Sequence, residues 1–261
     1  MVRYQRLEIQ HQHPVATVKL DRPGTGNRID WAMAAELREV CRTIAEDDGV
    51  RLLIVTGNGN DFSVGRETPS DDILSGRLED LLGWISRLQV ASSLAGLPVP
   101  VIAAINGDAF DHGLELALAA DLRIAAADAR FGLTDLGRGA FPWDGGTQRL
   151  PRIVGPSWAR DMVLTGRIVD AAAALGMGLV NRVVPKEELL GEARQLADSI
   201  IAGAPIAARY AKEAVQTGMD LSLPQGLRLE ADLNILLHST SDRAEGIQSF
   251  LERRTPNFRG V

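Results

Sequence analysis

The sequence predicts an α/β layered fold that is followed by a helical C-terminal region. Short apolar segments typical of strands alternate with helical segments through the first two-thirds of the 261 residues. After about residue 187 only helical patterns remain. We therefore predict two regions, a core at residues 1–203 and a helical region at residues 204–261.

Four segments rich in apolar residues predict the strands, at residues 15–20, 51–56, 101–105 and 122–125. The first reads VATVKL, and such alternation is typical of a strand with one buried face. The first three segments are followed directly by the turn sequences DRPG, GNGN and NG, which predict that each strand ends there.

The helices are predicted from caps and from apolar periodicity. Asp30 is a plausible N-cap for a helix that runs to about Asp47. The apolar residues of that helix fall on one face: Met33, Leu37, Val40, Cys41 and Ile44. Residues 115–120 also predict a helix, and the C-terminal region predicts four, at residues 188–202, 205–217, 226–237 and 242–253.

Composition argues against several classes of partner. The net charge is −6 and no block of basic residues stands out, so neither nucleic acid nor an anionic membrane is an expected partner. The single cysteine, Cys41, cannot form an internal disulfide, and no Cys/His cluster predicts a metal site.

No apolar segment approaches the roughly 18 residues that span a bilayer. The first residues do not form a signal peptide, so we expect a reduced, cytoplasmic setting.

Four motifs follow one another along almost the whole chain. They are residues 52–57 (LLIVTG) with 61–65 (DFSVG); residues 100–107 (PVIAAING) with 113–117 (GLELA) and Asp121; residues 131–132 (FG) with 145–150 (GGTQRL); and residues 250–258 (FLERRTPNF). In this order and spacing the chain resembles the crotonase (enoyl-CoA hydratase/isomerase) superfamily. The resemblance implies a spiral of ββα units followed by a helical trimerisation region, assembled as a homotrimer or as a hexamer made of two trimers. It also implies an acyl-CoA thioester substrate and no cofactor beyond the CoA of that substrate.

Chemistry next to an acyl thioester passes through an enolate whose charge sits on the carbonyl oxygen, and preorganised N–H donors stabilise it. The resemblance places two such backbone N–H groups on Arg66 and His112, beside Gly65 and Gly113. The family commonly has Gly-Ala-Asp and Gly-Gly-Gly where this chain has GRE and DHG. Two interpretations of the second segment stay open: a helix cap followed by an exposed first-turn residue, or a role for the His112 side chain.

Hydration of an enoyl thioester needs one group that activates water and one that protonates the α-carbon. The resemblance assigns these roles to Glu115 and Asp135, although the hydratases have Glu at the second position. The alternative is that Glu115 is a surface helix residue and Asp135 a turn residue. Asp144 is a third candidate, because a simple hydratase typically has Ala there. It is either a catalytic acid or base, or a loop residue that bonds its own backbone.

Two aromatic residues, Phe141 and Trp143, are candidates to line an acyl pocket. Arg22, Arg66 and Arg254 could bind CoA phosphates. The family's usual basic position after the first glycine motif is not matched clearly, because residues 68–72 read TPSDD. A substrate other than a CoA thioester therefore stays open.

Three functions compete. The first is an enoyl-CoA hydratase-like lyase of fatty acid metabolism that uses Glu115 and Asp135. The second is a C–C bond hydrolase, acting on a β-diketone or a cyclic 2-ketoacyl-CoA, that depends on Asp144. The third is an acyl-CoA-binding protein without activity, in which the altered segments at Arg66 and His112 no longer form an oxyanion hole.

Overall fold

The computed structural model describes residues 4–68 and 76–261. Its main sheet has six strands, in the spatial order β1 (Leu7–Gln12), β2 (Val15–Leu20), β3 (Leu52–Gly57), β4 (Val101–Ile105), β6 (Leu122–Ala126) and β9 (Arg182–Val184). The first two strands form an antiparallel hairpin, and all other neighbours are parallel. Every residue of β4 is buried, as expected for a central parallel strand.

A second, smaller sheet lies where the predicted active-site motifs meet. It consists of β5 (Ala109–Phe110), β7 (Arg130–Gly132) and β8 (Val169–Asp170). Strand β5 pairs with β7 in parallel, so the residues that follow both strands emerge at the same edge. This edge therefore carries the segment that begins at Asp111 and the segment that leads to Asp135.

Seven helices surround the two sheets within the described core: α1 (Trp31–Glu46), α3 (Leu78–Leu88), α4 (Ala91–Ala95), α5 (His112–Leu118), α6 (Gly146–Thr165), α7 (Ala171–Gly176) and α8 (Leu189–Ile201). The predicted cap of α1 is confirmed, because an Asp30 carboxylate oxygen accepts a hydrogen bond from the Met33 N–H at 2.7 Å. The five apolar residues predicted for one face of α1 are all buried. Helix α8 packs on β3, β4 and β6.

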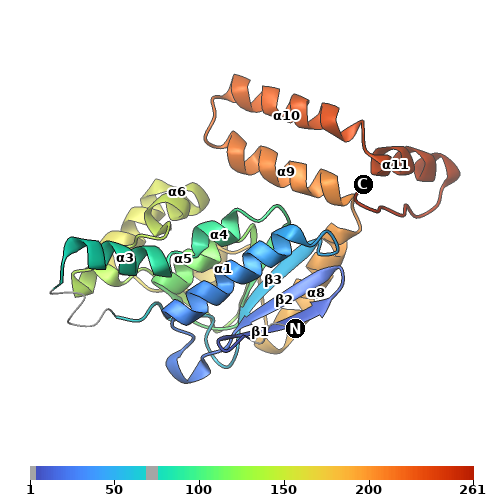
Figure 1. Ribbon diagram of the computed structural model, residues 1–261. Coiled ribbons are helices and arrows are strands. Elements are labelled where there is room, and N and C mark those ends of the chain that lie inside the picture. The colour runs from blue at the N-terminus through green and yellow to red at the C-terminus, as the bar shows by residue number, and fades with distance from the viewer. Residues whose placement is uncertain (1–3, 69–75) are drawn as a thin grey trace.

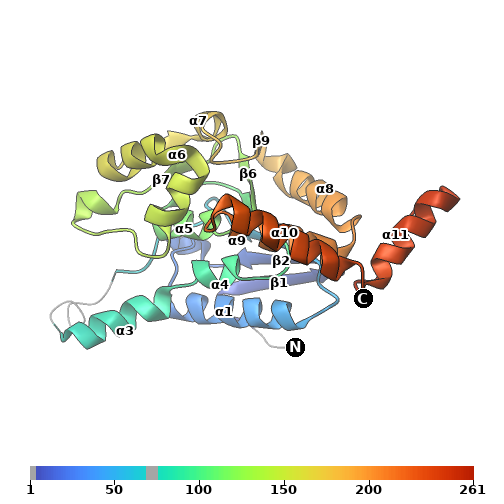
Figure 2. The ribbon, with the colours of Figure 1, turned by 90° about the horizontal axis from the view of Figure 1, so that it is seen from above.

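The C-terminal helices leave the core. Helices α9 (Pro205–Gly218) and α10 (Leu223–Leu237) form an antiparallel pair, and α11 (Ser241–Glu252) extends away from the rest of the molecule (Figure 1, Figure 2). The helices predicted at residues 205–217, 226–237 and 242–253 are thus confirmed as α9, α10 and α11, with ends shifted by up to three residues, and the helix predicted at residues 188–202 is confirmed as α8 of the core. The predicted boundary falls between α8 and α9 and stays a prediction of domain organisation.

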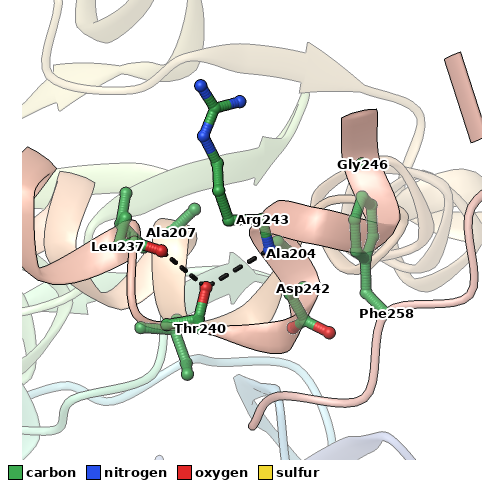
Figure 3. A pocket seen from close by; sticks show the side chains of 9 residues that line it. Ala204, Ala207, Leu237, Thr240, Asp242, Arg243, Gly246 and Phe258 are labelled. Carbon is green, nitrogen blue, oxygen red and sulfur yellow. Dashed lines mark hydrogen bonds between the residues drawn. The ribbon is translucent and has the colours of Figure 1, made fainter. Parts of the chain in front are cut away.

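The end of the chain folds back onto α11. The Asp242 carboxylate accepts hydrogen bonds from the Arg259 and Gly260 N–H groups, at 2.7 and 2.8 Å. Beside this turn lies a cavity of about 180 Å³ between α9 and α11, and the Phe258 ring closes it next to Gly246 (Figure 3). This cavity belongs to the C-terminal region and is remote from the predicted catalytic residues.

Among the described elements, the strands β1, β5, β7, β8 and β9 and the helices α3, α4, α6 and α7 were not predicted from the sequence. Strand β1 is missed because only Leu7 is buried in an otherwise polar edge strand. Helices α3 and α4 are missed too, although α3 carries apolar residues at helical spacing, among them Leu81, Trp84, Ile85 and Leu88. Helix α5 begins three residues earlier than predicted. Within the two described ranges, no helix is long and apolar enough to cross a bilayer.

Candidate active site

Two chain segments that are distant in sequence meet at Ser63. The Ser63 carbonyl accepts a hydrogen bond from the Phe110 N–H at 2.9 Å. It also lies so close to Gly113 that a Cβ atom there would be 2.0 Å from its oxygen. Gly65 has a φ of 119°, a conformation that favours glycine. Both predicted pocket glycines are therefore required by backbone geometry, and they bring the start of α5 against the Arg66 loop.

The two candidate oxyanion-hole N–H groups have no protein acceptor within the described residues. The parallel bridge between Ile29 and Arg66 uses the Gly65 carbonyl and the Glu67 N–H, so the Arg66 N–H points away from it. His112 is the first residue of α5, where an N–H group cannot bond within the helix. In the part of the chain that the structure describes, neither donor is used by the protein itself.

Glu115 is fully buried in α5. Its Oε1 accepts hydrogen bonds from the N–H groups of Asp144 and Gly146, at 2.8 and 2.9 Å. Its Oε2 is buried without a hydrogen-bond partner among the described residues. Burial raises the pKa of Glu115 to about 7, and these two N–H groups only partly oppose the shift. Glu115 is thus not a surface residue, and near neutral pH it can give or take a proton.

His112 is also fully buried, so the interpretation of an exposed first-turn residue is wrong. Its Nδ1 lies 3.7 Å from Oε2 of Glu115, and its Nε2 lies 3.4 Å from Oδ2 of Asp144. Its ring meets the Trp143 ring edge-on, with centroids 5.1 Å apart. Burial, reinforced by the Arg66 charge, lowers the pKa of His112 to about 3, so the ring is neutral at physiological pH.

Asp111 stands at the N-cap position of α5, but its side chain does not cap the helix. Its backbone has a φ of 47°, and its carboxylate accepts hydrogen bonds from the Thr134 N–H and the Arg138 guanidinium. The simple cap interpretation is therefore wrong. The carboxylate instead ties the start of α5 to the loop after β7.

Asp144 is buried and does not bond its own backbone, so the loop interpretation is wrong. Its Oδ2 accepts hydrogen bonds from the N–H groups of Val90 and Ala91, at 2.8 and 2.9 Å. These groups lie at the start of α4, an element that the sequence did not predict. Burial raises the pKa of Asp144, and the two backbone donors limit the shift.

Asp135 is buried too, but in a different set of contacts. Its carboxylate pairs with the Arg66 guanidinium at 3.2 Å and with Arg138 at 3.1 Å. Within the described residues no hydrogen bond or ion pair joins it to Glu115. Arg138 was missed in the sequence, although its spacing of three residues from Asp135 is a detectable signal. The Arg66 guanidinium also lies over the Trp143 ring, 4.9 Å from its centroid.

The two aromatic candidates differ. Trp143 belongs to the site, where it contacts His112 and lies 5.9 Å from Trp84, a residue of the unpredicted helix α3. Phe141 is 61% exposed and lies outside the buried cluster, so the structure does not support it as a pocket residue. A cavity of about 480 Å³ opens beside Trp143 and Asp144, between α4, α6 and α9.

The arginines proposed for CoA phosphates are all paired with carboxylates. Arg22 pairs with Asp30 and Glu67, and Arg254 pairs with Glu245 and Glu252. Residues 69–72 of the acidic segment lie outside the described residues. The structure thus identifies no phosphate site at these three arginines.

Residues 10–261 match the family model described as enoyl-CoA hydratase/isomerase. The chain belongs to the enoyl-CoA hydratase/isomerase family. It is 36% identical to a crotonyl-CoA hydratase of Syntrophomonas wolfei, over 98% of both chains. It is 37% identical to a 2,3-dehydroadipyl-CoA hydratase of Escherichia coli, over 97% of this chain and 98% of that one.

Solved structures confirm the fold of this family member. A crystal structure of an enoyl-CoA hydratase from Bacillus anthracis superimposes with a TM-score of 0.93 at 36% identity, covering 98% of this chain and 100% of that one. The predicted crotonase fold is therefore confirmed, and the chain is an enzyme of the hydratase/isomerase family.

Proposed function

We propose that this enzyme adds water across the double bond of a 2-enoyl-CoA thioester. One observation carries the proposal: Glu115 is buried, one of its oxygens has no partner among the described residues, and it lies three residues from the N–H group that begins α5 and that none of these residues accepts. Several similar proteins are named as hydratases of enoyl-CoA substrates, which supports the same substrate class. The reaction transfers no electrons and needs no cofactor beyond the CoA of the substrate.

In the proposed reaction the N–H groups of Arg66 and His112 hold the thioester oxygen. The water oxygen adds to C3 of the substrate, and electron density moves from the double bond to the thioester oxygen as an enolate. The proton that the water loses passes to Glu115, Glu115 then delivers a proton to C2, and the carbonyl re-forms. One such N–H donor contributes about 3–4 kcal/mol of transition-state stabilisation. Glu115 transfers a proton in this sequence, since its pKa of about 7 allows both directions.

The second carboxylate predicted from the family is Asp135. Its pairing with Arg66 and Arg138 favours a different role in this chain, in which it holds the Arg66 loop in place. Because Glu115 and His112 are fully buried, the substrate reaches them only when side chains such as Trp143 or Arg66 move aside. We therefore expect Asp135→Asn to weaken substrate binding more than it slows turnover.

The direct test is crotonyl-CoA hydration by wild type and by Glu115→Gln. The glutamine oxygen can still accept both backbone N–H bonds, but the side chain cannot transfer a proton. We expect kcat to fall at least about 100-fold, the lower range for general acid–base catalysis, with a smaller change in KM. Full turnover by Glu115→Gln would refute the assignment. Tight binding of enoyl-CoA by the wild type without any turnover would favour the binder instead.

C–C bond hydrolysis is the second candidate, and the buried position of Asp144 next to His112 favours it. It predicts that the wild type cleaves a cyclic β-diketone, and that Asp144→Asn does not. Hydration predicts that crotonyl-CoA is consumed while the diketone is recovered unchanged. A parallel assay of both substrates therefore separates the two functions.

A further inference from the structure

Three of the buried side-chain atoms without a hydrogen-bond partner, among the described residues, lie in a single cluster. They are Nδ1 and Nε2 of His112 and Oε2 of Glu115. Buried polar atoms are normally paired, because leaving one unpaired is energetically unfavourable. Nδ1 faces Oε2 at 3.7 Å, and Nε2 faces Oδ2 of Asp144 at 3.4 Å. Small movements would close both gaps, and catalytic hydrogen bonds often tighten only when substrate binds.

The contacts of the two carboxylates decide where the protons lie. Oε1 of Glu115 already accepts two N–H bonds, so a proton on this carboxyl group must sit on Oε2. Oδ2 of Asp144 accepts two N–H bonds as well, which favours the ionised form. With Glu115 protonated and His112 neutral, Nδ1 accepts from the Glu115 carboxylic acid and Nε2–H donates to the Asp144 carboxylate, and the Leu88 backbone carbonyl is a further acceptor next to the ring.

We propose that His112 is a positioning residue that links Glu115 to Asp144 in one buried hydrogen-bonded chain, so that Asp144 rather than Asp135 is the carboxylate coupled to Glu115. This inference rests on the proposed hydration and assigns a side-chain role within it. The His112 backbone N–H remains free for the thioester oxygen, while its ring fixes the proton of Glu115 on the oxygen that has no other partner. Asp135 is excluded from the chain because both of its ion pairs are with arginines.

The charged groups around the chain come from four elements. Arg66 faces His112 and Glu115 from the loop after β3, and Asp144 faces both from the loop before α6. Arg149 of α6 and Arg38 of α1 act on Asp144. The Asp144 charge raises the pKa of Glu115 and the Arg66 charge lowers it. Removing the Asp144 charge should therefore move the titration of Glu115 to lower pH.

The first experiment compares His112→Phe, which keeps an aromatic ring without donors or acceptors, with His112→Gln, which keeps one donor and one acceptor. We expect kcat for crotonyl-CoA to fall about 100-fold in His112→Phe and less than about 10-fold in His112→Gln. The pH dependence of kcat should show the titration of Glu115 near pH 7. In both His112→Phe and Asp144→Asn this titration should shift to lower pH. His238→Gln, at the exposed end of α10, is the matched control and should behave as wild type. The proposal would be overturned if His112→Phe had the kcat of the wild type and the same titration near pH 7.

The second experiment does not depend on turnover. Nitrogen NMR of the labelled wild type distinguishes the four histidines, and the signal absent from His112→Gln identifies His112. We expect a neutral ring with the proton on Nε2 between about pH 5 and pH 7, where Glu115 still carries its proton. A ring that is charged at pH 7, or a proton on Nδ1, would contradict the chain. If no enoyl-CoA is hydrated, the proposed function fails, while this measurement still decides whether the chain exists.

Discussion

Glu115 and His112 are neighbours in the site, and burial moves their pKa values in opposite directions. Burial disfavours the charged form of each group, so the pKa of the acid rises to about 7 and the pKa of the imidazole falls to about 3. Both side chains are therefore neutral at slightly acidic pH. The two shifts affect stability in different pH windows, because the groups ionise in opposite directions.

Glu115→Gln should stabilise the protein at alkaline pH. Wild-type Glu115 has a raised pKa in the folded state, so its contribution to stability is complete below about pH 4 and is lost as pH rises through about 7. Glutamine stays neutral and avoids this loss. We compare the free energy of unfolding of the variant with that of the wild type. We expect this difference to be more favourable to the variant at pH 8 than at pH 4, by about 3 kcal/mol.

Urea unfolding at a series of pH values measures this difference. The exposed Glu187→Gln is the control, and we expect its free energy of unfolding to differ from wild type by a constant amount. Near pH 7 the change in the free energy of unfolding comes from Glu115. The contribution of His112 is lost only at lower pH, as the pH falls from about 6.5 to about 3. If the free energy of unfolding of Glu115→Gln differed from that of the wild type by the same amount at every pH, the buried carboxyl group would titrate as it does in water.

At the scale of elements, short pieces of backbone build the site. Helix α4 has only five residues, yet its first N–H groups hold Asp144. The start of α5 is held by the approach of Gly113 to Ser63 and by the Asp111 carboxylate. The proposed oxyanion hole would therefore depend on how the helix ends are placed, and a side chain larger than that of Gly113 would displace the start of α5.

Gly113→Ala should be strongly destabilising. The added Cβ would lie 2.0 Å from the Ser63 carbonyl oxygen, and backbone atoms cannot yield as a flexible side chain does. We expect the free energy of unfolding to fall by about 3 kcal/mol or more. The remaining folded enzyme should lose kcat, because the His112 N–H is displaced.

The control for this substitution is Gly191→Ala in α8, where an added Cβ meets nothing within 4 Å. There we expect unchanged activity and a gain of up to about 1 kcal/mol from helix propensity. Thermal unfolding of both variants, followed by circular dichroism, measures the contrast. Equal stabilities would show that the segment around Ser63 can move away from α5.

At the scale of the whole molecule, the C-terminal helices expose an unusual amount of apolar surface. Phe250 and Leu251 of α11 are 82% and 74% exposed, and several apolar residues of α9 and α10 are also exposed, among them Val215, Met219, Leu223, Leu227 and Ile235. Large exposed apolar patches mark interaction sites in soluble proteins. This surface supports the predicted trimer or hexamer, whose interface these helices would form.

Leu251→Asp should therefore dissociate the assembly. A charge buried in an apolar interface is costly, so we expect the molar mass measured by light scattering to fall toward that of a single 28.1 kDa chain. Leu82→Asp is the matched control, because this leucine is also exposed but belongs to α3, which lies at the opposite end of the molecule from α11 (Figure 1). A monomeric wild type would contradict the prediction at once.

The sequence by itself determined the central strands, the capped helix α1, the helical C-terminal region and the family. These features depend on local periodicity, caps and ordered motifs, which a single chain displays directly. It also located Glu115, His112 and Asp144 without deciding their surroundings. Only the tertiary structure decided that His112 lies between two carboxylates and that Asp135 pairs with Arg66, 69 residues away in the chain. Such contacts arise from how distant loops are packed, and no local pattern encodes them.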